Sequence, residues 1–286
     1  MMTRLAALLL TMAATTSNAG IRQYQAELDN SQWQLSESSP LQCVLRHQIP
    51  GYGSAEFVSH ASKLLNMQFT LHMLRKPDSK TEVKLQSVPP SWRPGVPSQP
   101  LTELTFYRQF DGELEKDDAW LILSELERGM QPTFYYQDWQ DKQAVSVALS
   151  SVNFAHSYNQ FSQCLNSLLP YNFDDISFTV LHHDKYGELT RESVEQLDRI
   201  ITFLSLDPRS EIILLDVYTD SYGTDKTNMA LTRQQAQKLK EDLISNGINE
   251  QRITSQAHGE KRHVADNRSD QERQRNRRVV LRIEPF

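Results

Sequence analysis

The stretch EIILLDVYTDSYG, residues 211–223, decides the fold of the C-terminal half of the chain. Residues 212–215 form an unbroken apolar run and Val217 follows, which is typical of a central strand covered by helices. Thr219-Asp220 would end this strand, and a turn through Gly223 would lead into the next element. The pattern therefore predicts an acidic side chain, Asp220, at one edge of a buried sheet.

Helical and extended patterns alternate on both sides of this strand. Residues 176–181 predict a strand, and Thr190 predicts the cap of a helix with one apolar stripe, Val194, Leu197, Ile201 and Leu204. A helix after Gly223 would face inward with Leu231, Ala236, Leu239 and Leu243, and would end at Asn246-Gly247. Two further strands, near 253–258 and 279–283, would follow this helix and complete the sheet. We expect an α/β sandwich with a mixed sheet, β-α-β-α-β-β, over residues 171–286.

The N-terminal half carries mostly β patterns. Residues 67–73 alternate apolar and polar side chains, and residues 83–85 and 145–149 repeat the alternation, which predicts an antiparallel sheet with one wet face. The Pro-rich stretch 88–100 predicts an exposed connection outside any central strand. Short helices are predicted after Asp117-Asp118 up to Gly129 and over residues 155–168. The fold class is therefore α+β, with a β-rich domain at 20–170 and a boundary near Pro170.

The first residues have the order of a secretory signal. Arg4 precedes an apolar run at 5–14, and Ser17-Asn18-Ala19 supplies small residues, so we expect a signal peptide over 1–19 with cleavage after Ala19. The apolar run is shorter than the roughly 20 residues that span a bilayer, and no later stretch is longer, so no membrane span is expected. The first cysteine is Cys43, so the lipid attachment motif of lipoproteins is absent. The mature protein is predicted to be soluble and exported.

The two cysteines, Cys43 and Cys164, predict one disulfide in an exported chain. A bridge across their separation of 121 residues would stabilise the fold by about 4–5 kcal/mol in the chain-entropy model. Two buried free thiols are the alternative.

Neither composition nor motif predicts catalysis. The net charge of −6 and pI of 5.8 argue against nucleic acid as a partner. His47, His60 and His72 lack the spacing of metal ligands, and no nucleophile is placed beside a base. We expect no enzyme activity, no cofactor and no metal.

Several short motifs in the C-terminal half occur in a recognisable order: Thr219-Asp220-x-x-Gly223, Asn228, Leu231-Thr232, Asn246-Gly247-Ile248, Arg252-Ile253, Gly259-Glu260 and Arg273-x-x-Asn276-Arg277-Arg278-Val279. With these motifs, residues 171–286 resemble the OmpA-like peptidoglycan-binding domain. The resemblance implies that the domain binds the diaminopimelate stem peptide of peptidoglycan.

The resemblance also implies roles for individual residues. Diaminopimelate presents an ammonium and a carboxylate on one carbon, so its receptor needs an acceptor beside a donor. Asp220 matches the acidic residue that takes the ammonium in this family. The position of the family's carboxylate-binding Arg holds Gln235, whose neutral amide would cost about 1–2 kcal/mol of binding free energy. Arg277 is the favoured replacement for the missing cation, ahead of Arg273.

The remaining site residues follow from the same resemblance. Thr219, Asn228 and Leu231 are expected to lie beside Asp220, and Asp184 is expected to line the pocket. Arg233 should point away, since residues two apart on a helix face different ways. Two alternatives stay open: Asp220 as a turn cap beside a solvated arginine cluster, and a metal site on His182-His183, for which no third ligand has helpful spacing.

As a whole, the chain resembles the periplasmic T-ring components of sodium-driven polar flagellar motors. This impression rests on the domain order, the cysteine positions, and stretches such as 33–35, 57–58 and 149–154. The resemblance implies a T ring anchored to peptidoglycan, a MotX-like partner protein, the flagellar basal body, and stator units of the PomA/PomB type. A peptidoglycan-anchored envelope protein without a motor role, and a peptidoglycan hydrolase targeted by this domain, are the alternatives.

Overall fold

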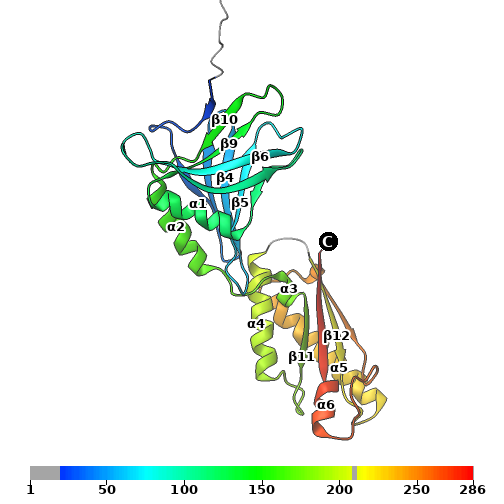
Figure 1. The fold of residues 1–286 in the computed structure, drawn as a ribbon. Coiled ribbons are helices and arrows are strands. Elements are labelled where there is room, and N and C mark those ends of the chain that lie inside the picture. The colour runs from blue at the N-terminus through cyan, green and yellow to red at the C-terminus, as the bar shows by residue number, and fades with distance from the viewer. Residues whose placement is uncertain (1–19, 208–210, 286) are drawn as a thin grey trace, which may run out of the picture. The chain divides into compact units, whose positions relative to one another are not determined.

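The computed structural model describes residues 20–207 and 211–285 and shows an α+β protein (Figure 1). The predicted signal peptide, residues 1–19, lies outside the described residues. The chain divides into two compact units. Of the described residues, the first contains 20–34, 45–57 and 68–158, and the second contains 35–44, 58–67, 159–207 and 211–285. Among the described residues, no helix is long and apolar enough to cross a bilayer.

Two five-stranded sheets account for the N-terminal half, with strand orders β1-β10-β9-β6-β7 and β2-β3-β4-β5-β8. The strands are β1 (Arg22–Tyr24), β2 (Trp33–Ser38), β3 (Gln42–Ile49), β4 (Gly53–His60), β5 (Gln68–Met73), β6 (Thr81–Val88), β7 (Gln99–Phe106), β8 (Gly112–Leu114), β9 (Gln131–Gln137) and β10 (Ala144–Ala148). The Pro-rich stretch ends in β7, an edge strand, where the missing N–H of Pro100 is tolerated. One pairing departs from the predicted antiparallel sheet, because the short β1 runs parallel to β10.

Aromatic rings fill the core between the strands of this half. Alternation along β5 buries Phe69, whose ring lies 4.9 Å from that of Phe57 and 5.8 Å from that of Phe134. Helix α1 (Lys116–Glu127) begins with two acidic residues and buries Ile122 and Leu123. The predicted alternation of apolar and polar side chains along the strands therefore forms this core.

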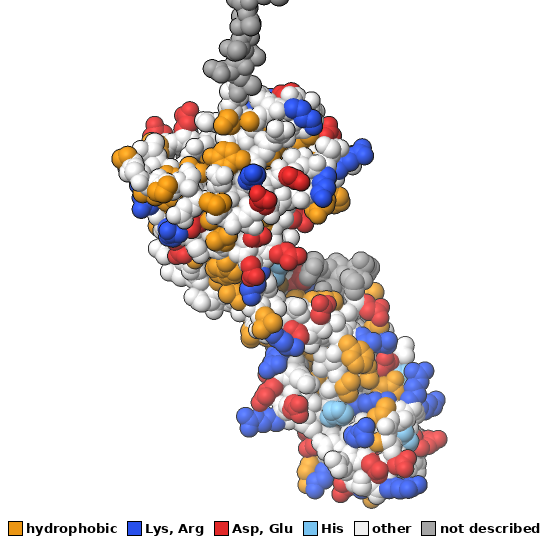
Figure 2. Space-filling model, in the orientation of Figure 1, with side chains coloured by type: hydrophobic (Ala, Val, Ile, Leu, Met, Phe, Trp, Pro, Cys, Tyr) orange, Lys and Arg blue, Asp and Glu red, His pale blue; other side chains and the backbone are white. Residues whose placement is uncertain are grey.

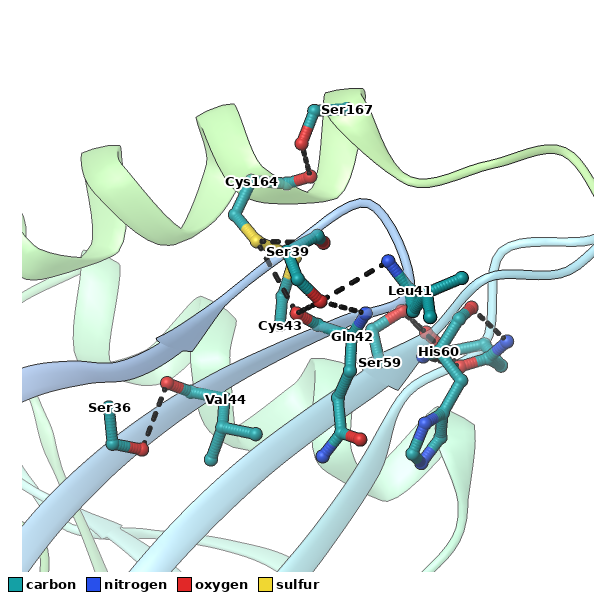
Figure 3. The surroundings of a disulfide bond; sticks show 11 residues. Ser36, Ser39, Leu41, Gln42, Cys43, Val44, Ser59, His60, Cys164 and Ser167 are labelled. Carbon is teal, nitrogen blue, oxygen red and sulfur yellow. Dashed lines mark hydrogen bonds between the residues drawn. A yellow bond between two sulfur atoms is a disulfide. The ribbon is translucent and has the colours of Figure 1, made fainter. Parts of the chain in front are cut away.

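A disulfide joins Cys43 of β3 to Cys164 of helix α2 (Phe154–Ser167), and both side chains are buried. Figure 3 shows the bridge between the helix and the strand beneath it, with Cys164 Sγ 3.9 Å from the carbonyl oxygen of Gln42. The two Cα atoms lie 6.0 Å apart and no free cysteine remains. The cysteine pair is thus oxidised, as the sequence predicted.

The C-terminal half contains one mixed sheet of strand order β11-β14-β12-β13. Its elements are α3 (Phe173–Ile176), β11 (Phe178–His182), α4 (Arg191–Leu206), β12 (Glu211–Tyr218), α5 (Asp225–Ser245), η1 (Glu250–Arg252), β13 (Ile253–Ala257), α6 (Asp270–Asn276) and β14 (Arg278–Pro285). Strand β12 is parallel to β13 and antiparallel to β14. The short helix α6 was not predicted between the last two strands. A capping box between Ser269 and Glu272 starts it.

Helices α4 and α5 cover one face of this sheet. Their Leu197, Ile200, Leu239 and Leu243 are buried in one core with alternate residues of the strands, such as Leu215. The predicted cover of helices over β12 is present on one face only, and Leu214 and its neighbours on the other face are half-buried. Figure 2 shows apolar side chains on that open face.

Two residues predicted to face inward do not. Val194 of α4 is 42% exposed and Leu231 of α5 is 37% exposed. Leu231 lies instead beside the turn after β11, where a Cβ added to Gly187 would lie 3.8 Å from its Cδ1. Leu231 therefore faces this turn and not the core of the sheet.

Candidate functional site

Asp220 and Arg277 form a buried ion pair at one end of the C-terminal sheet. Arg277 Nη1 donates to Asp220 Oδ2 over 2.7 Å, and the two side chains are 13% and 8% exposed. Asp220 follows β12 and Arg277 precedes β14. Because Tyr218 and Arg278 are partners in the antiparallel ladder, the end of β12 and the start of β14 meet at the same sheet edge. Pairing of the strands brings together two charges that lie far apart in the sequence.

Asp220 also caps its own turn. Its Oδ1 accepts the backbone N–H of Tyr222 over 3.0 Å. Gly223 completes the turn with φ of +114°, and a Cβ there would lie 3.1 Å from Asn228 Oδ1. Asp220 therefore caps its own turn with one carboxylate oxygen and pairs with Arg277 through the other.

Three segments are tied together around this pair. Asn228 of α5 is buried, and its Nδ2 donates to the carbonyl oxygen of Asp220 over 3.3 Å and to Glu260 Oε2 over 2.6 Å. The backbone N–H of Thr219 donates to the carbonyl oxygen of Gly259 over 2.9 Å. These bonds fix the strand end, the helix and the loop after β13. Glu260 is part of the sequence motif, but the motif alone assigned it no role. Its contact with Asn228 shows that it holds the side chain of that residue.

Gln235 does not reach the ion pair. It is 8% exposed, and its Nε2 donates to the carbonyl oxygen of Gly187 over 3.2 Å. It lies seven residues beyond Asn228, about 10 Å along the helix axis. Arg233 is exposed, as predicted.

The structure does not bring Asp184 or Arg273 to Asp220. Asp184 Oδ1 accepts the backbone N–H groups of Tyr186 and Glu188, over 2.8 and 3.0 Å, and so caps the turn after β11. Arg273 pairs with Asp270 on its own helix and donates to the carbonyl oxygen of Asn267 over 2.9 Å. Of the two arginines considered from the sequence, only Arg277 contacts Asp220.

Asn276 holds the loop that leads into α6. It is fully buried; its Oδ1 accepts the N–H groups of Val264 and Ala265, and its Nδ2 donates to the carbonyl oxygen of Ala265 and to Asn267 Oδ1. The side-chain amide therefore fixes the backbone just before Arg277. Figure 2 shows charged side chains of both signs around this end of the unit.

His182, which ends β11, and His183, which follows it, are not grouped with a third metal ligand among the described residues. His183 is buried, and burial lowers its pKa to about 4, so its ring is neutral at physiological pH. His182 Nδ1 lies 3.3 Å from the carbonyl oxygen of Gln274. Within 20–207 and 211–285, no three His, Cys, Asp or Glu residues are grouped to hold a metal ion.

Two known families match successive parts of the chain. Residues 24–170 match the MotY N-terminal domain, and residues 184–277 match the OmpA family. The chain is also 42% identical over 264 residues to the sodium-type flagellar protein MotY of Vibrio parahaemolyticus, covering 92% of this chain and 90% of that protein. The chain belongs to the MotY family.

Other relatives match shorter parts of this MotY-family chain. Outer membrane protein A of Shimwellia blattae is 36% identical over 97 residues, which are 34% of this chain and 40% of that protein. Among solved structures, the peptidoglycan-associated lipoprotein of Burkholderia pseudomallei aligns with 22% identity and a TM-score of 0.34, over 37% of this chain and 89% of that one.

Proposed function

We propose that this protein is a periplasmic component of the flagellar motor. It anchors the T ring to peptidoglycan, and it helps to incorporate and hold stator units of the PomA/PomB type. The observation that carries the proposal is the 42% identity to sodium-type MotY over 92% of the chain. The predicted signal peptide supports export to the periplasm.

The C-terminal unit supplies the wall anchor in this proposal. Asp220 accepts the ammonium of the diaminopimelate stem, and Arg277 supplies the N–H groups for the neighbouring carboxylate. The contact between Arg277 and Asp220 supports this assignment, because it holds an acceptor and a donor together at one edge of the sheet. Thr219 and Asn228 position Asp220, while Leu231 and Gln235 lie at the edge of the site beside Gly187.

In this proposal, the absence of an arginine at the position of Gln235 lowers the affinity of each single site for the stem peptide. The many sites of a ring offset this loss. Gln235 binds the backbone of Gly187 and contributes no charge. Many copies around a ring engage the wall together, so avidity multiplies a modest affinity. Arg273 and Asp184 then act indirectly, by shaping the loops on either side.

The N-terminal half of the chain supplies the contacts with the motor. It binds the flagellar basal body and a MotX-like partner protein, and its match to the MotY N-terminal domain supports this division of labour. The disulfide contributes by fixing helix α2 to strand β3 in this part of the chain.

The wall anchor is tested with the mature chain, residues 20–286. The protein should pellet with purified peptidoglycan, and Asp220→Ala should weaken pelleting, while Asp266→Ala, on an exposed loop near the site, should not. If the wild-type protein fails to pellet with peptidoglycan even at low salt, the wall anchor is refuted.

The motor role is tested separately by co-purification with basal bodies. The protein should be present in them, and a deletion strain should swim poorly. Normal swimming with altered envelope integrity would instead support an envelope protein without a motor role.

A further inference from the structure

One turn of unusual construction occurs twice in the C-terminal unit. Residues 182–187, HHDKYG, and residues 218–223, YTDSYG, share an Asp, a Tyr two residues later and then a Gly. In both, the Asp Oδ1 accepts the backbone N–H of the Tyr, over 2.8 Å in the first and 3.0 Å in the second. Both glycines have positive φ, +87° and +114°. The two turns are therefore built by the same Asp-capped hydrogen bond.

The strand register places these two turns side by side. His182 and Tyr218, which end β11 and β12, both pair with Arg278 of β14. Because β11 and β12 are each antiparallel to β14, they run in the same direction and release their turns at the same sheet edge. Two strand spacings separate them, about 10 Å. Arg277 precedes Arg278 and so lies between the two turns.

Both turns hold a tyrosine ring out in the solvent. Tyr186 is 77% exposed and Tyr222 is 84% exposed. The turns themselves are fixed, since Asp184 N–H donates to the carbonyl oxygen of Glu188 over 2.7 Å, and Ser221 N–H donates to Asn267 Oδ1 over 3.3 Å. Exposed aromatic rings on hydrogen-bonded turns, on either side of a buried charge pair, indicate a contact surface for a ligand.

We propose that Tyr186 and Tyr222 form a saccharide-binding platform that contacts the glycan strand of peptidoglycan. This inference rests on the proposed function, because it adds a glycan contact to the stem-peptide site. The C–H bonds on one face of a pyranose ring are weakly positive, and they pack on the negative face of an aromatic ring. Tyrosine offers such a face at low conformational cost, since it orders only two torsions.

The spacing of the platform fits this ligand. The separation of about 10 Å between the turns corresponds to the length of one disaccharide unit. A stem peptide hangs from the glycan, and three extended residues reach about 10 Å. A stem held at Asp220 and Arg277 therefore carries its sugar to within reach of the tyrosines. Asp220 itself links the two parts of the site, because it both pairs with Arg277 and caps the turn of Tyr222.

The test uses the mature chain and two soluble probes, a disaccharide that carries the stem peptide and the same stem peptide without sugar. By titration calorimetry, the wild type should bind the disaccharide-peptide about tenfold more tightly than the peptide. The double variant Tyr186→Ala/Tyr222→Ala should lose this tenfold preference and bind the free peptide within twofold of the wild type. Tyr107→Ala, which alters an exposed tyrosine of the N-terminal half, is the matched control and should retain the preference.

The outcomes separate this inference from the function on which it rests. Equal affinity of the wild type for both probes would refute the platform and leave the stem-peptide site standing. A preference that survives in the double variant, with unchanged melting temperature, would also refute it. Binding of neither probe would overturn the stem-peptide site at Asp220 and Arg277, and the platform with it.

Discussion

The buried pair of Asp220 and Arg277 should couple the stability of the C-terminal sheet edge to the binding site. At 2.7 Å the Coulomb attraction is about 6 kcal/mol for an effective dielectric constant near 20, and desolvation of the two side chains offsets much of it. Arg277→Met would leave the Asp220 carboxylate buried without its ion partner. We expect this variant to lose about 3–5 kcal/mol of local unfolding free energy.

A double-mutant cycle isolates the interaction. Asp220→Asn retains an acceptor for the guanidinium, so it should cost less, about 1.5–3 kcal/mol. The double variant Asp220→Asn/Arg277→Met removes both charges and should be more stable than the sum of the single losses predicts. The expected coupling energy is about 2 kcal/mol.

Hydrogen exchange read by mass spectrometry suits this cycle, because it reports each unit of the chain separately. Protection should fall in peptides that cover β12 and β14, while peptides from β9 serve as an internal control. A loss below about 1 kcal/mol in Arg277→Met would refute the reasoning, since that value is typical of an exposed pair. A double variant whose loss of unfolding free energy equals the sum of the two single losses would also refute the reasoning.

Three further perturbations give distinct outcomes. The variant Cys43→Ser/Cys164→Ser should lose about 4–5 kcal/mol of unfolding free energy, measured by urea titration without reductant; an unchanged midpoint would contradict a stabilising bridge. The pKa of His183 falls from 6.5 to about 4 on folding, so the unfolded chain takes up the proton first and unfolding free energy should drop by up to about 3 kcal/mol as pH falls through that window. His183→Gln should flatten that dependence, and an equal slope in both proteins would refute the assignment. Gln235→Arg should strengthen binding of the free stem peptide about tenfold in calorimetry; an unchanged affinity would refute a role for this position in binding the carboxylate.

Local patterns predicted much of the fold and part of the site. The apolar run of β12, the Thr190 cap of α4 and the alternation along β5 each depend on neighbours within a few residues, so they can be read along the chain. The cysteine pair was predictable because the chain holds only two. The repeated Asp-x-Tyr-Gly pattern was equally visible in the sequence and could have pointed to the two tyrosine turns.

The tertiary structure alone decided which of these residues meet. Strand β14 lies between β11 and β12, so Arg277 lies next to Asp220 although 57 residues separate them. The same arrangement sets the two tyrosine turns side by side, and the packing of α5 directs Gln235 toward Gly187 instead of the ion pair. Helix and turn signals are short-range, whereas strand order and register depend on pairing between distant segments. The sequence by itself therefore predicted the main elements of the C-terminal half and placed Asp220 at a strand end, while the order of the strands determined its partner.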